Sequence, residues 1–170
     1  MLQLQCTQKT FKFMGRKPQN LPEEPNATPL GVWYAKAIDI GGMDYLIFVN
    51  DPTLYAVLVN YLYTIMGISI EALFKDQLFA ALTADGVSEA TALAKIYALD
   101  PTIFTKTSSR SILGTMNDLV HNLYACMELD YEVTGFVDLF DIQKRLNRIP
   151  QRYLEWGFAY EKMREVLQGP

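Results

Sequence analysis

The sequence has very little cysteine and histidine, and this scarcity excludes several classes of site. Among 170 residues there are two cysteines, Cys6 and Cys126, and one histidine, His121. Their spacing matches no zinc-ligand pattern, and two cysteines cannot make a disulfide framework. We therefore expect a cytoplasmic protein that contains no metal and no other cofactor.

Long apolar runs and an excess of positive charge are also lacking. The longest candidate for a membrane span, residues 54–70, is broken by Asn60, Thr64 and Gly67, whereas a span needs about 20 predominantly apolar residues. The N-terminus has no apolar core of a signal peptide. The formal net charge of −4 argues against a protein held on nucleic acid by its bulk charge. We predict no membrane partner, and nucleic acid is not the favoured partner.

What the chain does contain is enough apolar material for one domain. Hydrophobic residues make up 50% of the sequence and charged residues 20%, and a chain of this length is expected to bury roughly 70% of its unfolded surface. We predict a single domain over residues 1–170, with a loop at 16–29 and a helical C-terminal extension at 130–170. The loop is predicted because four prolines lie too close together for a helix or strand: Pro18, Pro22, Pro25 and Pro29.

Alternating and apolar stretches predict the strands. Residues 2–7 alternate apolar and polar side chains, as a half-buried strand does. Gly41 and Gly42 form a two-residue turn between strand-like arms at 33–40 and 43–50. The second arm is apolar on both faces, so we expect an interior strand that is covered on both sides.

Helical periodicity dominates after residue 68, except for a strand expected at 103–107. Ser69 and Ser88 are predicted to cap two helices, and further helices are expected near 110–129, 134–149 and 152–167. For residues 54–63 the pattern does not decide between a strand and a short helix. We therefore predict an α+β domain: a small antiparallel sheet, made of the N-terminal strand and the Gly-Gly hairpin, covered by a helical C-terminal half.

Three stretches resemble segments of an uncharacterised bacterial family, a domain of unknown function. They are LQCTQK at 4–9, LGVWYA at 30–35 and SRSILGTMND at 109–118. Members of that family begin with a Cys-Thr-containing strand and carry Leu-Gly-x-Trp-Tyr/His-Ala and Ser-Arg-Ser-x-Leu-Gly-x-Met-Asn-Asp segments. The similarity covers about residues 2–120, and the tail from residue 130 and the proline-rich insertion depart from the pattern. The resemblance implies a shared fold, but no activity, cofactor or catalytic residue.

Hydroxyls and a guanidinium gather at the expected start of the helix near residue 110. Such a start exposes unpaired backbone N–H groups and partial positive charge, which suit a phosphate or a carboxylate. On a helical wheel, Gly114, Asp118 and His121 lie opposite the apolar face, with Asn117 at its border. The candidate binding site therefore comprises Ser109, Arg110, Ser111, Asn117 and Asp118.

A purely structural explanation of the same residues stays open. In that case Ser109 or Ser111 only caps the helix, which contributes about 1 kcal/mol. Arg110 then pairs with a nearby carboxylate, and Gly114 allows close packing of the helix. The Asn-Asp pair that follows would then anchor a neighbouring loop.

The favoured function is a non-enzymatic binding or interaction module, which takes a small anionic ligand or an unidentified protein at this site. The alternative is an enzyme that acts on a phosphorylated or nucleic-acid substrate, with Arg110 holding phosphate and Asp118 or His121 moving protons. The sequence contains no nucleophile elbow, no phosphate-binding glycine loop and no zinc-protease motif. The favoured function therefore names no catalytic residue.

The C-terminal segment combines basic and aromatic residues. Lys144, Arg148 and Arg152 are four residues apart and could form a basic ridge. Together with an N-terminal half made of Lys9, Lys12, Arg16 and Lys17, this ridge could form a patch for RNA or DNA, with Tyr153 and Trp156 as stacking residues. An ordinary solvated helix face is the favoured interpretation. The aromatic residues of the tail also suggest a homodimer formed through it.

Overall fold

The protein is described by a computed structural model that covers residues 1–22 and 30–168. Of the predicted proline-rich loop, residues 16–22 contain no helix or strand. The remaining part of that prediction, residues 23–29, lies outside the described residues. No helix within the described ranges is both long and apolar enough to cross a membrane.

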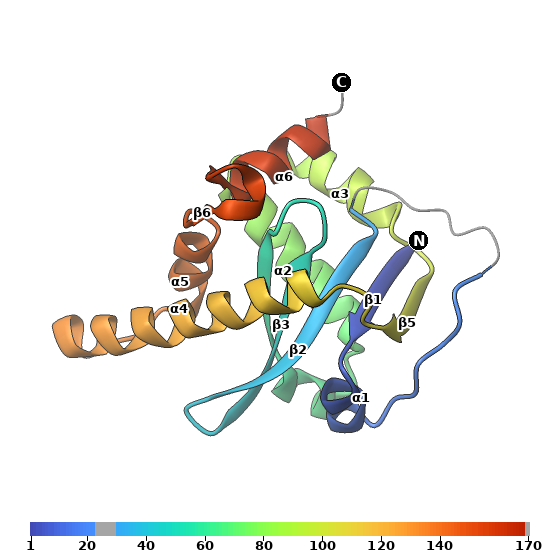
Figure 1. Cartoon of the computed structure of the whole chain (residues 1–170), viewed down its shortest axis with the longest axis horizontal. Helices are drawn as coiled ribbons and strands as arrows, with labels where there is room; N and C mark the ends of the chain where they lie inside the picture. Colours follow the sequence, from blue (N-terminus) through green and yellow to red (C-terminus); the bar gives the residue numbers. More distant parts are fainter. Residues whose placement is uncertain (23–29, 169–170) are drawn as a thin grey trace.

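The main sheet has five strands in the order β4-β3-β2-β1-β5 (Figure 1). β1 lies between β2 and β5 and runs parallel to both, whereas β2, β3 and β4 are antiparallel neighbours. The strands are β1 (Leu2–Cys6), β2 (Val32–Ile40), β3 (Met43–Asn50), β4 (Ala56–Asn60) and β5 (Thr102–Lys106).

The prediction of an antiparallel sheet was therefore wrong, although the α+β class is confirmed. The sheet is mixed because long connections lead from β1 to β2 and from β4 to β5. Connections of this length return the chain to the starting end of the sheet, which allows parallel pairing. The alternation within a strand shows which side chains share a face, but it does not show the direction of the neighbouring strand.

Helices cover both faces of the sheet. One face packs against four helices and forms a core that we call the α2-side core; the other packs against two and forms the α4-side core. The first set is α1 (Gln8–Met14), α2 (Ile70–Ala84), α3 (Glu89–Tyr97) and α6 (Ala159–Gln168). The second set is α4 (Arg110–Thr134) and α5 (Leu139–Leu146).

β3 contributes to both cores, as its apolar sequence predicted. Leu46 and Phe48 lie in the α2-side core, and Ile47 and Val49 lie in the α4-side core, all with essentially no exposed surface. Trp33 of β2 packs edge-on against Phe74 of α2 in the first core. The sheet therefore forms the middle of three layers.

Local signals placed several element ends correctly. Ser69 and Ser88 accept hydrogen bonds from backbone N–H groups three residues ahead and cap α2 and α3. Gly41 and Gly42 both have positive φ angles, 61° and 83°, in the turn between β2 and β3. The undecided stretch from residue 54 holds both kinds of structure: β4 is followed directly by a short 3-10 helix, η1 (Tyr61–Met66).

The C-terminal helices are shorter than predicted. Between α5 and α6 lies a small hairpin, β6 (Pro150–Gln151) and β7 (Gly157–Phe158), joined through the 3-10 turn η2 (Arg152–Leu154). A proline has no N–H to continue a helix, which explains why Pro150 starts a strand here. Both α5 and α6 contribute to the cores, through residues such as Ile142 and Met163.

Candidate functional site

β1 and β5 end side by side, and the chain leaves them toward opposite faces of the sheet. After β1 it forms α1, whose Phe11 belongs to the α2-side core. After β5 it forms α4, whose Ile112 belongs to the α4-side core. In open α/β sheets, ligands bind in the crevice outside the carboxyl ends of strands whose connections diverge in this way.

A polar crevice with a volume of about 470 Å³ lies at this place. Its floor consists of polar side chains of β1 and β5 that point away from the α2-side core. In β1, Leu2 and Leu4 point into that core, so the intervening Gln3 and Gln5 point to the other face. We call it the polar crevice; it is lined by Gln3, Gln5, Pro18, Gln19, Asn20, Leu21, Thr105, Lys106 and Ser108.

Hydrogen bonds fix the segment between β5 and α4 against this floor. The Ser108 backbone N–H and hydroxyl both donate to Oε1 of Gln5, at 2.8 and 3.0 Å. The Ser108 hydroxyl also lies 3.0 Å from the Tyr34 hydroxyl. Gln3 donates from Nε2 to the Thr105 hydroxyl at 2.9 Å. The start of α4 is therefore held in place by β1 and β2.

The side-chain amide nitrogen of Gln5 has no hydrogen-bond acceptor among the described residues. The side chain is almost buried, at 6% exposure, and it lines the polar crevice. Its Oε1 takes both bonds from Ser108, whereas its Nε2 donates to no acceptor in residues 1–22 and 30–168. A donor that faces the crevice in this way can bind an acceptor placed there.

Positive charge gathers beside the crevice without acidic partners. Lys36 of β2 donates from Nζ to Oδ1 of Asn117 at 2.6 Å. Burial lowers the pKa of Lys36, and the positive charge of Lys9 lowers it further. None of the ion pairs among the described residues involves Lys9, Lys36, Lys106 or Arg110.

Of the five predicted site residues, Asn117 contacts Lys36, and none of the five lines the polar crevice itself. The Ser109 hydroxyl accepts a hydrogen bond from the Ile112 N–H and caps α4. Arg110 and Ser111 are exposed in the first turn. Asn117 lies on the same face of α4 as Arg110, two helical turns further along. Asp118 lines a different cavity, which lies between α4 and the β6–β7 hairpin.

Parts of the purely structural explanation of this segment do not hold. Arg110 forms no ion pair with any described carboxylate. A Cβ atom added at Gly114 would have nothing within 4 Å in the described part of the chain, so close packing does not explain this glycine. Asn117 contacts strand β2 instead of a loop. Only the capping role of Ser109 is confirmed.

The glutamines of β1 and Lys36 were missed by sequence reasoning. The alternation of Gln3 and Gln5 with leucine is typical of a half-buried strand and predicts that both glutamines face solvent. Their partners, Thr105 and Ser108, lie about 100 residues away in sequence. Alternation identifies the face of a side chain, but only the strand order shows what lies opposite it.

His121 and the two cysteines take no part in the crevice. His121 is exposed on the outer side of α4. Burial raises the pKa of the Cys6 thiol to about 12, which makes it unreactive at neutral pH. Cys126 is partly buried against the α4-side core, as expected of an inert thiol.

The predicted basic ridge near the C-terminus is partly neutralised. Arg148 binds Asp85 at 2.7 Å and lies over the ring of Tyr160. Arg16, a residue of the other half of the predicted patch, binds Glu71 at 2.7 Å. These pairs interrupt the continuous positive track that a nucleic-acid backbone requires.

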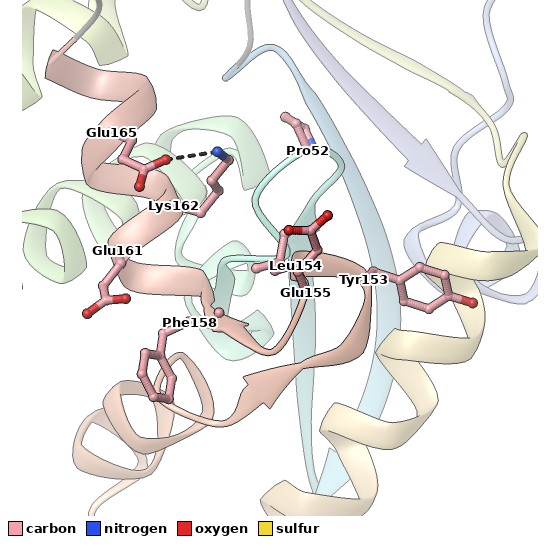
Figure 2. Close-up of a pocket in the computed structure, with 9 residues that line it drawn as sticks. Pro52, Tyr153, Leu154, Glu155, Phe158, Glu161, Lys162 and Glu165 are labelled. Atoms are coloured by element: carbon pink, nitrogen blue, oxygen red, sulfur yellow. Dashed lines mark hydrogen bonds and ion pairs between the residues drawn. The ribbon is translucent and has the colours of Figure 1, made fainter.

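A second cavity, of about 480 Å³, lies between the C-terminal hairpin and α6 (Figure 2). Three glutamates, Glu155, Glu161 and Glu165, line it, and Lys162 pairs with the last of them at 2.8 Å. No group of acidic residues within the described ranges is arranged to hold a metal ion. We assign no ligand to this cavity.

Comparison with protein-family models identifies the family. A model described as "Domain of unknown function (DUF6933)" matches residues 3–162. The chain belongs to the DUF6933 family. The predicted resemblance to an uncharacterised domain family is thereby confirmed, and the match includes α5, which lies beyond the stretch of about residues 2–120. No curated protein matches this sequence.

In this DUF6933 domain the three stretches that carried the resemblance lie on neighbouring elements, and the first of them contributes Gln5 to the polar crevice. LQCTQK forms the end of β1 and the start of α1, LGVWYA leads into β2, and SRSILGTMND begins α4. Cys6 pairs with Ala35 across the parallel strands, and the Tyr34 hydroxyl contacts Ser108 immediately before α4. The segments that carried the resemblance are therefore neighbours in the structure.

Proposed function

We propose that this DUF6933 domain is a cytoplasmic, non-enzymatic binding module that takes a small phosphate- or carboxylate-bearing ligand at the polar crevice and the start of α4. The observation that carries the proposal is the positive charge there: Lys36 is partly buried, lies near Lys9, and has only an amide oxygen as partner. A bound anion supplies the missing negative charge. The free N–H groups at the start of α4 and Nε2 of Gln5 are donors of the kind that bind such a group.

Gly114 supports the same proposal. A glycine inside a helix lowers stability by roughly 0.5–1 kcal/mol relative to alanine. No described side chain or neighbouring backbone needs the space above Gly114. It lies on the exposed side of α4, one turn after Arg110. Close approach of a ligand to the α4 backbone would require the absence of a side chain at this position. The packing of the fold does not require it.

Removing Arg110 tests the proposal directly. We expect inorganic phosphate or citrate to bind the wild-type domain and Arg110→Ala to bind the same anion about 10-fold more weakly, since hydrogen bonds to charged groups contribute about 1.5–3 kcal/mol. Isothermal titration calorimetry at two salt concentrations measures the affinity, which should fall as salt rises.

The matched control is Arg164→Ala, because Arg164 is also exposed but lies on α6. This variant should bind the anion like the wild type. Lys36→Met should weaken binding as Arg110→Ala does. Equal anion affinity in wild type and Arg110→Ala, or no binding to the wild type at millimolar anion, would overturn the proposed function.

Gly114→Ala should separate stability from binding. We expect the free energy of unfolding to rise by about 0.5–1 kcal/mol, because alanine favours the helix and its Cβ meets no neighbour. The affinity for the anion should fall at least several-fold, since the methyl group blocks close approach to α4. Chemical denaturation and calorimetry on the same preparation measure both quantities. A stability gain with unchanged affinity would contradict this role of Gly114.

No specific observation favours the enzyme alternative. Asp118 and His121 are both exposed, and neither side chain forms a hydrogen bond with another described residue. A homodimer through the aromatic tail stays a prediction. Tyr153 and Trp156 are largely exposed there, whereas Phe158 and Tyr160 are partly buried.

A further inference from the structure

A third cavity lies between α4 and the C-terminal hairpin, and we call it the turn cleft. One wall is α4, and the other is the segment from Ile149 to Tyr153 together with Trp156. Its volume is about 370 Å³, within the range of small-molecule sites. It is lined by Thr115, Asp118, Leu119, Asn122, Ile149, Pro150, Gln151, Arg152, Tyr153 and Trp156.

Two aromatic side chains that line the turn cleft are largely exposed to solvent. Tyr153 is 65% exposed and Trp156 is 68% exposed. Figure 2 shows the Tyr153 side chain extending from the hairpin toward α4. Rings of this kind have an apolar body and stack on other planar groups.

The backbone turn that carries Trp156 has a defined conformation. Trp156 and Glu155 both have positive φ angles, 69° and 54°. The Trp156 N–H donates to the Gln151 carbonyl at 3.0 Å, which closes the turn. At Gly157 a Cβ would lie 2.9 Å from the Leu154 carbonyl oxygen, so a side chain there would disturb the turn. Trp156 is therefore presented by a defined turn.

Unpaired polar groups lie beside the rings. Thr115 is 5% exposed and lines the turn cleft, yet its side chain forms no hydrogen bond within the described part of the chain. The Asp118 carboxylate likewise accepts no hydrogen bond from a described residue. Asn122 uses Nδ2 to reach the Asp118 carbonyl at 2.9 Å, so its Oδ1 is available. The cleft thus offers acceptors and a hydroxyl next to aromatic faces.

We propose that the turn cleft binds the base of a guanine nucleotide. The base stacks on Trp156 or Tyr153, and the Asp118 carboxylate accepts hydrogen bonds from its Watson–Crick edge. Flipped or free bases are bound by this combination of stacking and edge contacts. An ionised carboxylate accepts only, and guanine presents two adjacent N–H donors on that edge, whereas the other common bases present one donor group there.

The proposed anion site places the phosphates on the same helix. Arg110 precedes Asp118 by eight residues, which corresponds to about 12 Å along the axis of α4. A guanosine diphosphate or triphosphate can reach across this distance, with Gly114 between its two ends. This half of the inference rests on the proposed function, whereas binding of the base does not.

The test uses the fluorescence of the full chain. Trp33 is fully buried and Trp156 is 68% exposed, so emission changes on titration with nucleosides report on Trp156. We expect guanosine to quench the emission saturably and to bind at least 10-fold more tightly than adenosine, cytidine or uridine. Asp118→Asn should lose this preference, because an amide offers one acceptor and adds a donor. The matched control Glu161→Gln, on α6, should keep it.

Further arms separate this inference from the proposed function. Guanosine diphosphate should bind more tightly than guanosine in the wild type, and Arg110→Ala should remove only that gain. If the gain is absent while guanosine still binds selectively, the anion site fails and the base site stands. Calorimetry with Trp156→Leu should show at least 10-fold weaker guanosine binding.

Two results would overturn the base site. One is the absence of saturable quenching with every nucleoside, which would leave the exposed rings to a protein partner. The other is equal affinity for all four nucleosides. A guanine-containing oligonucleotide distinguishes RNA from a free nucleotide: we expect it to bind no more tightly than guanosine diphosphate, and much tighter binding would assign the cleft to RNA.

Discussion

Asp85→Ala is expected to lower the free energy of unfolding by about 2–4 kcal/mol, because it leaves the buried Tyr55 hydroxyl without its acceptor and removes the carboxylate that Arg148 binds. The Asp85 side chain is 2% exposed, and its two oxygens accept from the Tyr55 hydroxyl at 2.6 Å and from Arg148 at 2.7 Å. Burial, and secondarily the neighbouring carboxylate, raises the pKa of Tyr55, so this phenol stays protonated as a donor. Urea unfolding followed by circular dichroism measures the loss.

Two variants divide this effect between its partners. Tyr55→Phe removes one neutral donor and should lower stability by about 1–2 kcal/mol, whereas Asp85→Asn keeps the shape but removes the charge. Arg148 is 38% exposed at its side chain, so water can replace part of its interaction with Asp85. A loss below about 1 kcal/mol for Asp85→Ala would show that this network does not stabilise the contact between the end of α2 and the segments that precede β4 and follow α5.

Asn147→Leu is expected to lower the free energy of unfolding by about 2–6 kcal/mol, since it leaves two buried backbone groups unpaired at about 1–3 kcal/mol each. The Asn147 side chain accepts from the Ala56 N–H at 2.7 Å and donates to the Ala56 carbonyl at 2.9 Å. These two hydrogen bonds take the place of those that a neighbouring strand would form along the outer edge of β4. Chemical denaturation measures the change in stability.

Gln143 provides a matched control on the same helix, one turn before Asn147. Its Oε1 accepts from the Leu58 N–H at 2.6 Å, but its Nε2 is buried without a hydrogen-bond partner among the described residues. Gln143→Met leaves one backbone donor unpaired and also removes one unpaired amide donor. We therefore expect a clearly smaller loss of stability than for Asn147→Leu. Equal losses would argue against this difference in hydrogen bonding.

Gln143 and Asn147 also show that α5 and the residue that follows it are joined to the main sheet by side-chain hydrogen bonds. An open strand edge tends to pair with another chain, and natural proteins cover such edges. Here α5 covers the outer edge of β4 through side chains that bond its backbone. We therefore expect the unfolding of α5 and of the sheet to be coupled.

Much of the local structure followed from patterns of a few residues. The Gly41-Gly42 turn, the caps at Ser69 and Ser88, and the strand before α4 were all predicted, because each depends on neighbours in sequence. The C-terminal hairpin was missed because Pro150 predicts only a break between two helices, and Gly157 lies inside the second predicted helix, 152–167. The turn between these residues depends on contacts that short patterns do not contain.

The candidate site was predicted only in part. Its helix start was visible from the group Ser109, Arg110 and Ser111, which signals a cap and a positive helix end. The amide contributed by Gln5 and the charge of Lys36 were not visible, since both belong to strands far away in sequence. Asn117 and Asp118 are adjacent, but successive residues of a helix point about 100° apart, so they face different surroundings.

Most strands and helices before residue 130, the burial of β3 on both faces and the start of α4 could be predicted from sequence alone, because periodicity and capping act over short distances along the chain. The tertiary structure decided that β1 lies parallel between β2 and β5, that its glutamines form the floor of a crevice, and that Asp118 belongs to a separate cleft. These features depend on which distant strands pair and in which direction, and the free energy of that choice comes from the packing of the whole sheet between its two helical layers.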